Sequence, residues 1–121
     1  MGKIDLDWNK LTEFSPGNIE ALGDYIRGVF RLSYQHKDGN IYVFYVGESG
    51  NIKSDLLSLN SHPNNQCLES HTKTFKCFFR YAPVEQSELR KKVLEQLYKF
   101  YQPNCNEPIS IINNDIEINV N

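Results

Sequence analysis

Two apolar, aromatic-rich runs in the first half of the chain are separated by a short polar turn. The first run covers residues 27–35, and the second covers 41–46 and is apolar at nearly every position. Between them Asp38 precedes Gly39, and glycine supplies the positive φ that a tight turn needs. The pattern predicts a β-hairpin. Because the second run is so continuously apolar, we expect its strand to be central in a sheet and covered on both faces.

Apolar residues at helical spacing predict three helices. A short helix is expected over 19–23, with Asn18 as its N-cap. A second helix follows the predicted hairpin and ends at His62, because Pro63 disfavours helical geometry in the residue before it. The third and clearest helix covers 87–102, where apolar and charged residues occupy opposite sides.

The remaining segments have weaker patterns. Residues 73–82 alternate between two faces and predict a third strand, whereas the polar segment 63–70 predicts an exposed loop. Residues 1–14 mix acidic and apolar side chains, which is typical of a short strand or an irregular arm packed on a core. Isoleucines between 109 and 120, on both sides of the polar residues 113–115, predict a strand or a hairpin in the tail.

The order helix, strand, strand, helix, strand, helix predicts an α+β fold: a small three-stranded, mainly antiparallel sheet flanked by helices. A chain of 121 residues is long enough for one domain with one core, and too short for two. We therefore expect a single domain, with a core over 27–106, an N-terminal arm over 1–18 and a strand-like tail over 107–121.

The charge balance and the N-terminal residues bear on partners and location. The net charge is −2, and a dedicated nucleic-acid binder usually carries a basic excess, so tight non-specific DNA binding is disfavoured. Residues 1–7 lack an apolar leader, and no apolar run is long enough to span a bilayer. We expect a cytoplasmic protein that does not engage a membrane.

Cysteine and histidine spacing gives little sign of a metal site or of disulfides. The three cysteines, Cys67, Cys77 and Cys105, show no CxxC spacing, so neither a disulfide framework nor a zinc ribbon is expected. One alternative is a metal cluster that joins His62 and His71 to Cys67 and Cys77. Its spacings match no familiar zinc knuckle.

Four short motifs follow one another in an informative order. They are Gly28-Val29-Phe30, Tyr45-Val46-Gly47, the stretch 47–53, and a closing group made of Leu97-Tyr98, Pro103 and Asn106. Their order and spacing resemble the GIY-YIG nuclease superfamily, and the resemblance covers residues 28–106. It implies the α+β fold described above and, for an active member, metal-assisted phosphodiester cleavage that uses magnesium.

The resemblance assigns roles to a few positions, and most of them have changed. Tyr45 and Asn106 match the family's catalytic tyrosine and closing asparagine. The other family positions carry different residues here. Phe30 stands in place of a tyrosine, Asp55 in place of a phosphate-binding arginine, Leu59 in place of a histidine or tyrosine, and Leu94 in place of the glutamate that holds the metal. No metal ligand is therefore assigned, and no cofactor is expected unless the chain is active.

Two further carboxylates need placing. Glu95 is next to Leu94, but one residue along a helix turns a side chain by about 100°. That rotation puts Glu95 between Lys91 and Lys99 on the solvated face. Glu48 directly follows the second motif and makes the local charge less suited to phosphate.

Three functional hypotheses follow. The leading one is a catalytically degenerate GIY-YIG-like domain that binds nucleic acid or a protein, with Arg31 and Lys53 as the candidate nucleic-acid contacts. The second is an active magnesium-dependent endonuclease with a rearranged site, in which Glu95 or Glu48 holds the metal and Arg31, Lys53 or Arg80 replaces the arginine. The third is a protein-interaction or self-association module that uses the isoleucine-rich tail.

Overall fold

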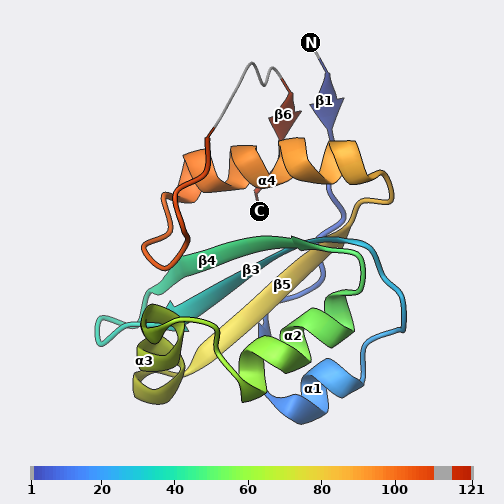
Figure 1. The fold of residues 1–121 in the computed structure, drawn as a ribbon. Helices are drawn as coiled ribbons and strands as arrows, with labels where there is room; N and C mark the ends of the chain where they lie inside the picture. Colours follow the sequence, from blue (N-terminus) through green and yellow to red (C-terminus); the bar gives the residue numbers. More distant parts are fainter. Residues whose placement is uncertain (1, 111–115, 121) are drawn as a thin grey trace.

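The computed structural model describes residues 2–110 and 116–120 and forms one main antiparallel sheet (Figure 1). In that sheet β3 (Gly28–Gln35) lies between β4 (Ile41–Ser49) and β5 (Cys77–Pro83), and β2 (Thr12–Glu13) pairs with the other side of β5. The α+β fold is confirmed. The sheet has a fourth strand beyond the three predicted: β2 lies in the N-terminal segment for which a short strand or an irregular arm was expected, and it is too short to show alternation.

The predicted hairpin joins β3 to β4. Gly39 has a φ of +86°, and its amide donates to the carbonyl of His36 at 2.9 Å, as the tight turn requires. Leu32 pairs with Tyr45 and Ser33 with Val43, so Phe44 is an extra residue in β4 and forms a bulge. The bulge lets Phe44 and Tyr45 pack against the same hydrophobic cluster.

β4 is an edge strand rather than the central strand that its apolar run predicted; β3 is central. The apolar pattern was misleading because β4 is covered on both faces, with Phe44 and Val46 buried, although one edge lacks a neighbouring strand. The segment after the last helix protects this edge. The Cys105 amide donates to the Phe44 carbonyl at 3.0 Å, and the Asn106 side chain hydrogen-bonds to Val46.

Helices cover the two faces of the sheet unequally (Figure 1). On one face lie α1 (Pro16–Glu20), α2 (Ile52–Ser61) and α3 (Gln66–Thr74), and on the other lies α4 (Ser87–Tyr101). The two faces bury separate hydrophobic clusters. The first includes Phe30, Phe44, Leu56, Leu68 and Phe79, and the second includes Val29, Val46, Ala82, Val93 and Leu97.

The α2 and α4 helices follow the sequence prediction, whereas α1 and α3 correct it. α1 begins earlier than predicted, because Ser15 and not Asn18 caps it. α3 replaces most of the exposed loop that was predicted over 63–70, and β5 therefore begins at Cys77, several residues later than predicted.

The two ends of the described chain lie side by side. β1 (Lys3–Ile4) pairs in parallel with β6 (Glu117–Ile118) beside α4 (Figure 1). Asn119 fixes this contact, because its side chain accepts from the Leu6 amide at 2.5 Å and donates to the Leu6 carbonyl at 3.0 Å. The strand predicted in the tail is thus present as β6, and it pairs with the N-terminal arm. The hairpin predicted around 113–115 lies outside the described residues. Among the described residues, no helix has the length and apolar character needed to cross a membrane.

Candidate functional site

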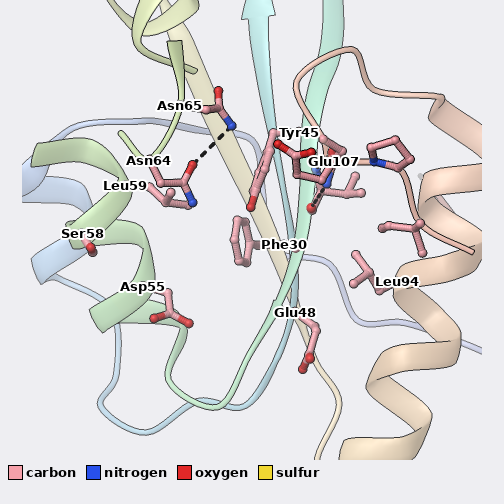
Figure 2. A pocket seen from close by; sticks show the side chains of 15 residues that line it. Phe30, Tyr45, Glu48, Asp55, Ser58, Leu59, Asn64, Asn65, Leu94 and Glu107 are labelled. Atoms are coloured by element: carbon pink, nitrogen blue, oxygen red, sulfur yellow. Dashed lines mark hydrogen bonds between the residues drawn. The ribbon is translucent and has the colours of Figure 1, made fainter. Parts of the chain in front are cut away.

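A cleft of about 620 Å³ opens where β3 and β4 meet α2 and the segment after α4 (Figure 2). It contains most of the positions that the family resemblance had singled out. The described residues that line it are Phe30, Tyr45, Val46, Gly47, Glu48, Asp55, Ser58, Leu59, Asn64, Asn65, Leu94, Asn106, Glu107, Pro108 and Ile109.

Phe30 and Tyr45 form an aromatic wall of the cleft. Their ring centroids are 6.1 Å apart, and Phe30 is almost fully buried. The Phe30 ring lies over Gly47, where an added Cβ would be only 2.5 Å from Cζ of the ring. The glycine of the second motif is therefore explained by packing: the ring occupies the space that a side chain would need. Phe30 itself brings no hydroxyl to the cleft.

Tyr45 is the retained candidate catalytic residue, and it lies beside the loop that precedes α3. Burial raises the pKa of its phenol, the nearby Asp55 carboxylate raises it further, and a hydrogen bond with Asn64 opposes them. The raised pKa makes the phenolate less accessible than in an ordinary tyrosine. A tyrosine that acts as a general base needs the phenolate, so the electrostatics of this cleft work against that role.

Asn106, the second candidate catalytic residue, also lines the cleft, but both ends of its amide are engaged. Its Oδ1 accepts from the Val46 amide at 2.8 Å, and its Nδ2 donates to the Val46 carbonyl at 2.8 Å. The side chain thus imitates a neighbouring strand at the open edge of β4. In this structure Asn106 positions the backbone of the cleft wall.

Three carboxylates surround the cleft: Glu48, Asp55 and Glu107 (Figure 2). Glu48 is paired with Arg90 of α4, whose Nε lies 3.1 Å from Oε1. Asp55 accepts a hydrogen bond from the Ser49 hydroxyl. Among the described residues that line the cleft, none is Lys, Arg or His.

The predicted nucleic-acid contacts lie outside this lining. Arg31 is on the opposite face of the sheet, where it donates at 2.7 Å to the Tyr101 hydroxyl and at 2.7 Å to the Val120 carbonyl. Its guanidinium also lies 4.5 Å from the centroid of the Trp8 ring. Lys53, at the start of α2, is 3.2 Å from the Asp24 carboxylate. Arg31 therefore has a structural role here, tying the tail to α4.

Leu94 and its neighbour Glu95 lie differently with respect to the cleft. Leu94 projects into the cleft (Figure 2), and the neighbouring Glu95 is absent from the described lining. Leu59 also lines the cleft where the family places a polar ring. His62 ends α2 and approaches Ser61, outside the lining.

The described cleft residues do not fit the magnesium ion that an active member would use. A cleft metal needs convergent oxygen ligands, and Glu48 is paired with Arg90 while Leu94 takes the expected ligand position. Among the described residues, the group of three potential ligands that converges on one point is Cys67, His71 and Cys105, outside the cleft lining.

The three cysteines do not behave as their spacing suggested. Cys67 and Cys105 form a disulfide that links α3 to the segment after α4, and Cys77 is a buried free thiol. This corrects the expectation that no disulfide forms. Sequence spacing could not reveal the pair, because its members are 38 residues apart and meet only when the segment after α4 folds back along the edge of β4 to reach α3.

Several cleft residues were not singled out from the sequence. Glu107 follows Asn106 directly, so the end of the last motif could have indicated it. Asn64 and Asn65 reach the cleft only because α3 begins there, with Asn65 as its N-cap. Arg90, the partner of Glu48, is an ordinary helix residue in sequence and gave no signal of its burial.

Comparison with known proteins identifies the fold. No protein-family model and no curated protein matches this chain. Solved structures of the GIY-YIG N-terminal endonuclease domain of UvrC from Thermotoga maritima do match. The magnesium-bound domain matches with a TM-score of 0.57 and 16% identity, covering 76% of this chain and 96% of that chain. A point mutant of that domain matches with a TM-score of 0.58 and 17% identity, covering 76% and 93%. At this level of identity the likeness shows the fold alone: the chain has the GIY-YIG fold.

Proposed function

We propose that this chain is a non-catalytic GIY-YIG-fold domain that binds a partner through its cleft. The observation that carries the proposal is the charge of the lining. Asp55 and Glu107 contribute carboxylates, Glu48 adds a third that is paired with Arg90, and the described lining contains no basic side chain. Phosphodiester cleavage develops negative charge on phosphate, which nucleases stabilise with cations. A cleft with this lining repels the substrate and stabilises no such charge.

The same charge favours a protein over a nucleic acid as the cleft's partner. Nucleic-acid affinity comes largely from lysine and arginine contacts with phosphates, and Arg31 and Lys53 lie outside the lining. A peptide with basic or amide side chains complements the carboxylates of Asp55 and Glu107 and the side-chain amide of Asn64. We therefore favour a protein partner at this cleft.

A nuclease assay tests the loss of catalysis. We expect no magnesium-dependent cleavage of plasmid, single-stranded or branched DNA by the wild-type chain. The matched variant combines Phe30→Tyr, Asp55→Arg, Leu59→His and Leu94→Glu, which puts the family residues back into the cleft. Cleavage by that variant alone supports the proposal. Clear cleavage by the wild type that disappears in Tyr45→Phe contradicts it.

A binding measurement separates the two partner classes. A fluorescent DNA or RNA probe should show no salt-dependent shift with the wild type at physiological salt. The double variant Asp55→Lys with Glu107→Lys reverses two charges in the lining and should bind the probe more tightly. A strong salt-dependent shift with the wild type that the double variant strengthens further would show that nucleic acid binds at the cleft and would contradict its role as a protein-binding site.

A further inference from the structure

Cys67, His71 and Cys105 gather where α3 meets the segment after α4. Their two sulfurs and one ring nitrogen all lie within 4.8 Å of one another. In the structure the cysteines are joined as a disulfide, with a Cα–Cα distance of 5.3 Å. His71 is one helical turn from Cys67, so its ring faces the same side of α3. The group contains two soft sulfur ligands and one imidazole.

Aromatic packing fixes the orientation of the His71 ring. It stacks on Phe44 with an interplanar angle of 9° and a centroid distance of 4.8 Å, and it contacts Tyr34 edge-on at 5.0 Å. In this orientation Nδ1 is 3.5 Å from the Cys105 sulfur and 3.9 Å from the Cys67 sulfur. The nitrogen therefore lies within 4 Å of both sulfurs.

These distances are close to those between ligands of a tetrahedral zinc ion. Zinc–sulfur bonds of about 2.3 Å and zinc–nitrogen bonds of about 2.0 Å place a nitrogen and a sulfur about 3.6 Å apart. Both nitrogen–sulfur distances already match this value within a few tenths of an ångström. The two sulfurs have to separate, which requires that the disulfide be reduced, and Nδ1 of His71 has to release the Cys67 carbonyl.

We propose that the reduced chain binds one zinc ion through the Cys67 and Cys105 thiolates and Nδ1 of His71. A dithiol reductant supplies two electrons and two protons to the disulfide, which gives two thiols and leaves the reductant as a disulfide. Zinc binding then displaces one proton from each thiol. Water completes the tetrahedron at the fourth position.

His71 changes tautomer between the two states. In the disulfide form Nδ1 lies 2.8 Å from the Cys67 carbonyl, and a carbonyl only accepts, so Nδ1 carries the proton. In the zinc form the proton resides on Nε2 and the lone pair of Nδ1 points to the metal. The net proton release on zinc binding therefore comes from the thiols.

In a reducing compartment a zinc ion would replace the disulfide as the link between α3 and the segment at Cys105. Disulfides are rare in the cytoplasm, where we expect the chain to work, and two thiols alone would leave α3 and the segment at Cys105 unlinked. Asn65, which lines the cleft, also donates to the Cys105 carbonyl at 3.4 Å, and Asn106 is the next residue. A zinc ion would hold these two walls of the cleft together when the disulfide is reduced.

Metal titration of the reduced full-length chain tests the proposal. The protein is reduced with a phosphine under anaerobic conditions, freed of metal, and titrated with Zn²⁺ and with Co²⁺ as a spectroscopic substitute. We expect one equivalent to bind, and the cobalt form to show thiolate charge-transfer absorption and the visible bands of a tetrahedral site. The oxidised chain should show neither. Absence of binding by the reduced wild type overturns the proposal.

Variants and alkylation identify the ligands. Cys67→Ser, Cys105→Ser and His71→Phe should each weaken zinc binding about 100-fold or more. Phenylalanine keeps an aromatic ring to pack on Phe44 and removes both ring nitrogens. Cys77→Ala and His62→Ala are the matched controls and should bind as the wild type does. Unchanged binding in both Cys67→Ser and His71→Phe overturns the assignment.

A second measurement does not depend on any variant being folded. In the reduced wild type, zinc should protect Cys67 and Cys105 from an alkylating reagent and leave the reactivity of Cys77 unchanged, as read by mass spectrometry. Protection of Cys77 alone, or of none of the three, contradicts the site.

Discussion

Gly28 and Gly47 lie where a side chain would collide with a neighbour, but the neighbours differ. An added Cβ at Gly28 would lie 2.1 Å from the Ala82 carbonyl oxygen, which belongs to the backbone of β5. At Gly47 the nearest atom belongs to the ring of Phe30, which borders the cleft. A ring beside open space can turn aside, whereas a paired strand has to move as a whole.

We therefore expect Gly28→Ala to lower the free energy of unfolding by about 3 kcal/mol and Gly47→Ala by about 1 to 2 kcal/mol. Urea denaturation measures both. Gly50→Ala is the matched control, because nothing lies within 4 Å of its added Cβ, and its effect should stay within about 0.5 kcal/mol. Equal effects of Gly28→Ala and Gly50→Ala would contradict the role of close strand packing.

Asn106 makes two hydrogen bonds with Val46, and only an amide can make both. In Asn106→Asp the carboxylate can still accept from the Val46 amide, but it cannot donate to the Val46 carbonyl. We expect a loss of about 1 to 3 kcal/mol in the free energy of unfolding. The neighbouring exposed residue gives the control, Asn104→Asp, which should be nearly neutral. If the two variants unfold at the same urea concentration, the two hydrogen bonds between Asn106 and Val46 do not stabilise the fold.

At the scale of elements, the C-terminal end of α4 is formed by a residue with an unfavourable backbone conformation. Gln102 caps the helix with a φ of +47°, in the left-handed region that favours glycine. Gln102→Gly should therefore raise the free energy of unfolding by about 0.5 to 1 kcal/mol. Lys99→Gly, inside the same helix, should lower it by about 1 kcal/mol. Thermal denaturation followed by circular dichroism measures both, and destabilisation by Gln102→Gly would show that the glutamine side chain outweighs the strain.

Elements with strong local patterns could be predicted from the sequence. The hairpin, α2 and α4 each have either a turn glycine or a long apolar stripe, and each was predicted closely. α3 was missed because it buries only Leu68 among polar residues, so no helical period was visible. The edge position of β4 was missed because burial depends on what covers a strand, and Asn106 and Cys105 come from far along the chain.

At the scale of the whole molecule, the sequence located the cleft but not its full composition. Motif order brought Tyr45, Asp55, Leu94 and Asn106 together, and all four line the cleft. The resemblance could not predict Glu107 or the Glu48–Arg90 pair, because neither occupies a family position. The disulfide was missed for the same physical reason as the protected edge of β4. Both depend on the segment after α4 folding back across the sheet.

That segment makes the disulfide important to overall stability. Cys67 and Cys105 are 38 residues apart. Closing a loop of that length lowers the conformational entropy of the unfolded chain, which raises its free energy by about 3 to 4 kcal/mol. We expect the free energy of unfolding, measured by urea denaturation, to be higher by this amount in the oxidised chain than in the reduced, metal-free chain. The same difference should persist in Cys77→Ala and vanish in the double variant Cys67→Ser with Cys105→Ser.

Reduction should also loosen the wall of the cleft next to the disulfide. The Cys105 amide donates to the Phe44 carbonyl, and the Val46 amide donates to Asn106, so both amides report on the attachment of this segment to β4. Their hydrogen exchange should accelerate in the reduced, metal-free chain more than exchange in the β3–β5 pairing. Local opening exposes only the amides of the segment that detaches. Uniform acceleration of exchange over the whole sheet would therefore mean that the disulfide stabilises the fold globally and has no special effect on the cleft.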